Sequence, residues 1–197
     1  MHRKKFVGAF FLHVLPAVFL LMGEFTLPAL GQVSFPTRYT EVQAASPLDL
    51  LEMEHRLHHG APAADSSYQI TSGEFAFHPG FPRLAAKIDA ILVRTSQILN
   101  IHLNPQSRLN IVLVADGKEV QRRYQHIIPG QRRGWFGFGS LEAYYETGSR
   151  TIYLSLRDLH AGILAHEMAH DLLCNGICPP PPAAEQEVWA HYVESRL

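Results

Sequence analysis

The spacing of apolar residues between positions 81 and 99 predicts an amphipathic helix. Apolar side chains recur there every three or four residues, which places them on one face of an α-helix. They are Leu84, Ile88, Ile91, Leu92, Ile98 and Leu99. We expect this face to be buried. A short segment rich in β-branched residues, Leu109–Val114, follows the helix and predicts a strand.

Two other parts of the chain show the alternation of apolar and polar positions that is typical of strands. Residues 68–77 show it first. Residues 137–146 and 151–156 show it again, and Gly148-Ser149 between them is typical of a turn. We therefore expect one further strand and one hairpin.

An aspartate precedes each of two further helical segments. Asp116 comes before the polar segment 118–127, and Asp158 comes before the segment 159–174. A carboxylate at this position can accept hydrogen bonds from the backbone N–H groups of the first helical turn. We expect both aspartates to be N-caps.

The end of the chain predicts a last helix after the segment 159–174. Asn175-Gly176 is typical of a helix end, residues 179–182 are four prolines that predict a stiff extended link, and residues 183–196 have a helical pattern. Strands followed by a helix, a turn and a helix predict an α+β fold. In this fold a small mixed or antiparallel sheet would pack on the helix 159–174, with the C-terminal helix beside it.

The first part of the chain differs from the rest. Residues 2–5 are positively charged, residues 6–22 are almost wholly apolar, and small residues stand at positions 29 and 31. This order is typical of a secretory signal peptide, which we expect to span residues 1–31 and to direct the protein to the periplasm or out of the cell. An uncleaved anchor helix is the alternative, and it would tether the protein to a membrane.

The remaining chain divides into two predicted regions. Residues 32–66 are rich in Pro, Ala, Ser and Gln, which indicates a linker, and one short helical stretch at 47–59 interrupts it. Residues 67–197 then form the predicted functional domain. Its length is enough for a single core, and nothing in it indicates an oligomeric state.

Charge and cysteine content limit the classes of function. The net charge is -1 at pH 7, and neither a general nucleic-acid binder nor a protein held to a membrane surface by charge fits this value. Cys174 and Cys178 lie in the part expected to be exported, where a disulfide between them is favoured over two free thiols. A metal site made by both is a third interpretation, although their spacing is wider than that of the usual zinc-binding pairs.

The segment His-Glu-Met-Ala-His at 166–170 indicates metal chemistry. His166 and His170 are one helical turn apart, so both imidazoles project from the same helix face and can reach one ion. Glu167 lies beside that face, where it can take a proton from a water molecule on the metal. A polar helix face without a metal is the simpler alternative.

A third protein ligand for zinc must come from later in the chain. The C-terminal helix supplies four candidates, which are Glu185, Glu187, His191 and Glu194. We expect Glu187 to be the ligand if this helix folds back against the motif helix. Glu194 or His191 would then orient an imidazole of the motif.

These residues together resemble the gluzincin group of zinc metallopeptidases, the thermolysin-like arrangement in which a glutamate from a following helix is the third ligand. More narrowly, the segments 150–156, 165–170 and 186–194 are similar to small exported bacterial peptidases. The likeness covers roughly residues 70–197. The chain is far smaller than thermolysin, its gap to the glutamate is shorter, and His191 stands where the larger enzymes carry an aspartate.

The resemblance implies zinc-dependent hydrolysis of a peptide or protein substrate. One zinc ion held by His166, His170 and Glu187 would acidify a water molecule, and Glu167 would accept its proton and pass it to the leaving amine. The oxyanion would need a hydrogen-bond donor beside the metal. The candidates for this donor are Tyr144, Tyr145, Tyr192 and His191.

A protein of a different class is the alternative to a peptidase. The small size of the chain also fits a non-catalytic binding or assembly module of the cell envelope that keeps zinc as a structural staple. Such a site would be closed by a fourth protein ligand, for example His191 or Glu194.

Overall fold

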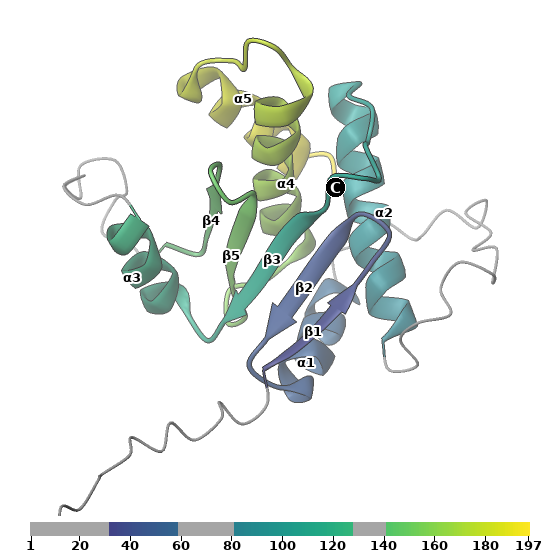
Figure 1. Cartoon of the computed structure of the whole chain (residues 1–197), viewed down its shortest axis with the longest axis vertical. Coiled ribbons are helices and arrows are strands. Elements are labelled where there is room, and N and C mark those ends of the chain that lie inside the picture. Colours follow the sequence, from purple (N-terminus) through teal and green to yellow (C-terminus); the bar gives the residue numbers. More distant parts are fainter. Residues whose placement is uncertain (1–31, 59–80, 128–140) are drawn as a thin grey trace, which may run out of the picture. The chain divides into compact units, whose positions relative to one another are not determined.

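A five-stranded mixed sheet and five helices make up the described part of the protein (Figure 1). The computed structural model describes residues 32–58, 81–127 and 141–197, which belong to one compact unit, Gly31–Leu197. The strands are β1 (Val33–Pro36), β2 (Thr40–Ala44), β3 (Leu109–Val114), β4 (Ala143–Glu146) and β5 (Thr151–Ser155). The helices are α1 (Pro47–His58), α2 (Pro82–Leu99), α3 (Gly117–Ile127), α4 (Ala161–Gly176) and α5 (Ala183–Glu194). The predicted α+β class is confirmed.

The sheet has the strand order β1-β2-β3-β5-β4 (Figure 1). The three inner strands β2, β3 and β5 are parallel, and β1 and β4 pair antiparallel at the two edges. In this register Ile111 of β3 lies between Val42 of β2 and Ile152 of β5. All three side chains are fully buried, so the centre of the sheet is also the centre of the core.

Residues 33–58 belong to the folded unit, and the prediction of a linker over 32–66 is wrong for this part. β1 and β2 complete one end of the sheet, and α1 follows where a short helix was expected. The side chains that they bury are Phe35, Val42, Ala44, Leu50, Met53 and Leu57. Two strands of four and five residues are too short for a clear alternation, so the composition dominated the prediction.

Helices α3 and α4 lie on opposite faces of the sheet at β4. The hydroxyl group of Tyr145 donates a hydrogen bond to Asp171 of α4 at 2.9 Å. The ring of its neighbour Tyr144 packs edge-on against Tyr124 of α3, with 4.7 Å between ring centroids. Because successive side chains of a strand point to opposite faces, the two helices cover different sides of the sheet.

Helix α2 confirms the prediction made from its apolar spacing. The first four apolar residues of the predicted stripe are buried, and the last two are half-buried; in order they are Leu84, Ile88, Ile91, Leu92, Ile98 and Leu99. Pro82 stands in the first turn, where its missing N–H costs no helical hydrogen bond. Asn100 ends the helix in a left-handed conformation, with φ of 54°.

The structure confirms one of the two predicted N-caps and contradicts the other. Asp116 accepts hydrogen bonds from the backbone N–H groups of Lys118 and Glu119, both at 3.0 Å, as expected. Asp158 does not cap α4, and that prediction is wrong. The N-cap is His160, whose ring nitrogen accepts from the N–H of Ile163. Asp158 instead accepts a hydrogen bond from the hydroxyl group of Ser155, because the chain turns before the helix begins.

The hairpin of β4 and β5 is confirmed, with β4 beginning at Ala143. The first residues predicted for that strand, 137–140, lie outside the described residues, as do the predicted strand at 68–77 and the N-terminal segment 1–31. Among the helices that the structure describes, none has the length and apolar character needed to cross a bilayer.

A buried aspartate joins α2 to the turn between β1 and β2. Asp89, 2 % exposed, accepts hydrogen bonds from the hydroxyl of Thr37 at 2.6 Å and from the backbone N–H of Arg38 at 3.1 Å. Burial raises the pKa of this carboxyl group above its ordinary value, against the smaller opposite effect of these hydrogen bonds.

We expect this burial to make stability depend on pH through Asp89. A carboxyl group with a raised pKa in the folded state holds its proton more tightly there than in the unfolded chain, so its stabilising contribution is full at low pH and is lost as pH rises through the folded pKa. We compare the free energy of unfolding of the wild type with that of Asp89→Asn. The advantage of the wild type over the variant should shrink as pH rises above 3.8, the ordinary pKa of an aspartate. Urea unfolding of both proteins from pH 3 upward measures this difference, and a difference that grows with pH would contradict the expectation.

Candidate metal centre

The motif helix α4 brings two imidazoles to one face, as the spacing of the motif predicts. The ring centroids of His166 and His170 are 5.1 Å apart, and each side chain is 13 % exposed. Burial lowers the pKa of His170, which favours the neutral imidazole that a metal ion needs. The two rings therefore present nitrogen lone pairs at the boundary between the core and the solvent.

Helix α5 folds back antiparallel to α4. The start of α4 meets the end of α5, where His166 contacts Glu194, and the later His170 contacts Gln186 near the start of α5. Ala190 and Val193 are fully buried on α5 and hold this helix against the core. Gly162 permits the close approach, because a Cβ atom there would lie only 3.1 Å from Cγ of Glu194.

This packing places Glu187 between the two histidines. Its Oε2 atom lies 3.5 Å from Nε2 of His166, and its Oε1 atom lies 3.5 Å from Nε2 of His170. One ligand atom from each of the three residues lies within 4.8 Å of the others, so this group could hold a metal ion. Glu185, the exposed alternative on the first turn of α5, belongs to neither candidate metal group found among the described residues.

The distances from Glu187 to the two histidines are close to those around a tetrahedral ion. Zinc bonds of about 2.0–2.1 Å to histidine nitrogen and carboxylate oxygen imply about 3.4 Å between neighbouring ligand atoms of a tetrahedron. Each Nε2 atom lies 3.5 Å from a different carboxylate oxygen of Glu187. Two imidazole nitrogens and one carboxylate oxygen are also a donor set that suits zinc among the common metals.

The second ring nitrogen of each histidine is held by a side chain of α5. Nδ1 of His166 lies 3.2 Å from Oε2 of Glu194, and Nδ1 of His170 lies 3.3 Å from Oε1 of Gln186. The amide group of Gln186 donates to the carbonyl of Pro181 at 2.7 Å, so its oxygen is left to accept from the ring. Both imidazoles then carry their proton on Nδ1 and turn Nε2 toward Glu187.

Gln186 was not expected from the sequence. Its role depends on a turn of α5 that also buries Ala190 and Val193, and no local pattern marks an amide for this task. Glu194 was among the residues expected to orient an imidazole, and the structure places it there. The ring of His191 packs edge-on against that of His166, with centroids 4.7 Å apart, and its Nδ1 is 3.4 Å from Oε2 of Glu194.

Glu167 is buried beside the three candidate ligands. Its carboxylate accepts a hydrogen bond from the backbone N–H of Tyr145 on the edge strand β4. Burial and the nearby charge of Glu187 raise the pKa of Glu167 to about 8. A cation held between the histidines would act in the opposite direction and favour the carboxylate. The group is therefore placed where it can exchange a proton near neutral pH.

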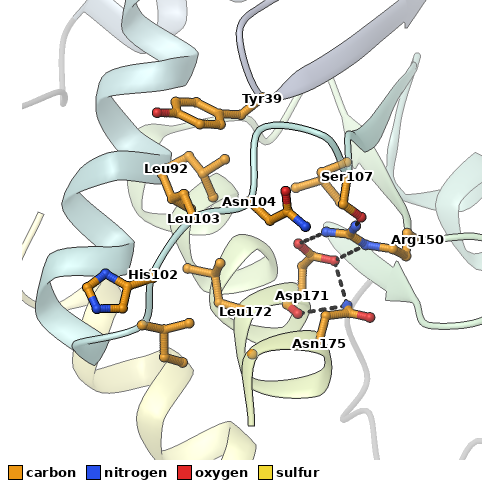
Figure 2. A pocket seen from close by; sticks show the side chains of 13 residues that line it. Tyr39, Leu92, His102, Leu103, Asn104, Ser107, Arg150, Asp171, Leu172 and Asn175 are labelled. Carbon is orange, nitrogen blue, oxygen red and sulfur yellow. Dashed lines mark hydrogen bonds and ion pairs between the residues drawn. The ribbon is translucent and has the colours of Figure 1, made fainter.

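The residue after His170 anchors the motif helix to the hairpin. Asp171, with 2 % of its side chain exposed, accepts from Nε and Nη2 of Arg150 at 2.9 and 2.7 Å. It also accepts from Tyr145 and from the amide of Asn175, both at 2.9 Å. Figure 2 shows Arg150 and Asn175 converging on Asp171 at the wall of a cavity of about 110 Å³. The cavity is separate from the metal centre, since none of the three candidate ligands lines it.

The tyrosines expected as oxyanion donors are committed to other contacts. The hydroxyl of Tyr145 bonds to Asp171 and Asn175, and only its backbone N–H turns toward the site. Tyr144 packs on α3, and burial raises its pKa to about 12. Tyr192 lies 42 % exposed and packs against Trp189.

The predicted disulfide is not formed. Cys174 and Cys178 are free thiols. Cys174 is half-buried on α4 and donates to Oε1 of Gln186 at 3.3 Å, while Cys178 is exposed beyond the end of that helix. The thiol of Cys174 points toward α5. It contacts Gln186, the residue that also contacts His170, and does not pair with Cys178.

No protein-family model, curated protein or solved structure matches the chain. The support for a function therefore comes from the geometry of the described residues.

Proposed function

We propose that the protein is a zinc-dependent peptidase that acts outside the cytoplasm. The observation that carries the proposal is the meeting of His166, His170 and Glu187 from two helices around one point. The buried acid beside them, Glu167, supports it further, because hydrolysis by a metal-activated water needs a group that accepts the proton of that water. The fold would then be a minimal zincin-like one, in which the sheet packs on the motif helix.

The three candidate ligands and Glu167 have separate tasks in this proposal. A bound zinc ion would supply Lewis acidity, lowering the pKa of a water molecule and polarising the scissile carbonyl. Glu167 accepts the proton of the attacking water on its carboxylate and then donates it to the leaving amine. The backbone N–H of Tyr145 holds that carboxylate in place. Glu194 and Gln186 keep the two imidazoles in the orientation that the reaction requires.

The edge strand β4 supports a peptide as the substrate. β4 pairs only with β5 among the described strands, and the backbone N–H of Tyr145 on β4 is bound to Glu167. An extended peptide can add to such an edge as a further strand. Since the N–H of Tyr145 in β4 reaches Glu167, a peptide on this strand would lie next to the proposed general base.

The alternative, a non-catalytic module closed around a structural zinc ion, requires a fourth protein ligand. Glu194 and His191 are the nearest candidates. Glu194 bonds to Nδ1 of His166, whereas Glu187 lies against Nε2. These nitrogens point to different sides of the ring, so Glu194 does not face the point between the first three ligands. The geometry favours the peptidase.

Zinc content of matched glutamate variants tests the proposed ligand set. We expect the purified wild type and Glu185→Ala to bind about one zinc ion per chain, since Glu185 is exposed and outside the site. Glu187→Ala should lose most of this zinc because it removes the carboxylate that lies against Nε2 of both histidines. Elemental analysis after dialysis measures the content. Equal zinc in Glu187→Ala and Glu185→Ala would contradict the assignment.

Export is the part of the proposal that depends on residues 1–31, which lie outside the described part. Their charge and apolar pattern support a cleaved signal peptide, and the alternative is a membrane anchor. N-terminal sequencing of the exported protein distinguishes them, since cleavage would produce a new N-terminus near residue 32.

A further inference from the structure

Three ligand-type groups form a second cluster next to the proposed zinc site. They are a ring nitrogen of His166, a carboxylate oxygen of Glu194 and a ring nitrogen of His191, all within 4.8 Å of one another. We propose that this cluster binds a second divalent transition-metal ion, such as zinc, more weakly than the first site does. The inference goes beyond the proposed peptidase function, which needs only one ion.

The distances in the cluster suit an ion. Oε2 of Glu194 lies 3.2 Å from Nδ1 of His166 and 3.4 Å from Nδ1 of His191. A tetrahedral zinc ion with bonds of about 2.0–2.1 Å requires about 3.4 Å between its ligand atoms. Two imidazoles and one carboxylate favour zinc, copper or nickel over magnesium and calcium. An ion in the cluster would replace the proton on Nδ1 of His166 and would move Oε2 of Glu194 out of its hydrogen bond to the ring, while the three ligand-type atoms already lie within 4.8 Å of one another.

The second ion would be distinct from the first because the two nitrogens of His166 face different partners. Nε2 lies against Glu187, and Nδ1 lies against Glu194. With both ions present, His166 would hold them as an imidazolate through its two ring nitrogens, and the proton of Nδ1 would pass to the solvent. Glu194 then exchanges its hydrogen bond to the ring for a bond to the ion.

This exchange makes the second site the weaker one. A partner that orients a histidine ligand contributes about 10–100-fold to metal affinity. The second ion removes that hydrogen bond, so its binding lowers the affinity of the first site. By reciprocity, the first ion lowers the affinity of the second site by the same factor. The side chain of His191 is also 70 % exposed and must be immobilised on binding. We expect the second site to fill only at zinc concentrations well above those that fill the first.

Zinc titration of the metal-free full chain by isothermal calorimetry tests the proposal through a pattern of three histidine variants. The wild type should show one tight and one weaker class of site, each of about one ion. His191→Ala should lose the weaker class alone, and His170→Ala the tight class alone. His166→Ala should lose both classes because its ring belongs to both sites. His126→Ala, an exposed histidine of α3, controls for zinc bound by surface imidazoles and should match the wild type.

The outcomes separate this inference from the proposed function. A weaker class that persists in His191→Ala, or a wild type with the tight class alone, overturns the second site and leaves the peptidase proposal standing. A wild type without a tight class overturns the peptidase proposal instead. His191→Asn is a second variant at this position and should also lose the weaker class of site. Circular dichroism of each variant establishes that the loss of a class of sites does not reflect unfolding.

Discussion

Replacing Glu167 by glutamine is expected to remove peptide hydrolysis while leaving the bound metal in place. The amide has nearly the same shape as the carboxylate but can neither accept the proton of the attacking water nor return it to the leaving amine. A positioned acid–base group contributes roughly 10²–10⁴-fold to the rate. We expect a fall in kcat/KM of this size, measured with a peptide library and then with the best substrate found.

The control for this experiment is Glu142→Gln, which changes an exposed glutamate just before β4 and should keep the wild-type rate. Zinc content should be equal in both variants and the wild type, because Glu167 is not among the candidate ligands. A Glu167→Gln variant that retains zinc and cleaves as fast as the wild type would rule out the proposed role of this residue. Loss of zinc together with activity would show that Glu167 supports the metal instead.

Removing the carboxylate of Asp171 is expected to destabilise the protein strongly. Asp171→Ala leaves the guanidinium of Arg150 without its bidentate partner and leaves the hydroxyl of Tyr145 without its acceptor. Breaking a buried ion pair on one side costs about 3–5 kcal/mol. The free energy of unfolding should fall by about this amount, measured by urea denaturation at neutral pH.

Two comparisons make the Asp171 measurement specific. Glu142→Ala removes an exposed acid and should change the free energy of unfolding by less than about 0.5 kcal/mol. Asp171→Asn keeps one oxygen for Arg150 and should be less destabilising than the alanine variant. If Asp171→Ala were as stable as Glu142→Ala, the network would not be what holds α4 against the hairpin.

This network also explains why the motif helix is positioned as it is. Asp171 follows His170 directly, so whatever fixes the carboxylate also fixes the rotation of α4 about its axis. The hairpin contributes in two ways through one residue, since the side chain of Tyr145 binds Asp171 and its backbone binds Glu167. The sequence indicated both α4 and the hairpin, but the contacts between them are not local and could not be predicted.

Prediction from the sequence succeeded where the signal was local. The helix α2 was expected at 81–99 and is found at Pro82–Leu99, because four turns of regular apolar spacing are a strong signal. It failed at β1 and β2, which were read as a linker. Strands of four and five residues carry little signal alone, and they are stabilised by pairing with one another and with β3, which lies more than sixty residues further along the chain.

The sequence by itself determined that His166 and His170 share a face and that Glu167 lies beside it, since these relations follow from the helical repeat. It narrowed the candidates for a third ligand to four residues of the last helix. Only the tertiary structure distinguished their positions, because the antiparallel packing of α5 on α4 directs Glu187 between the histidines and brings Glu194 to the far nitrogen of His166. Helical periodicity acts within one segment, whereas the rotation of one helix against another is set by the side chains that both bury in the core.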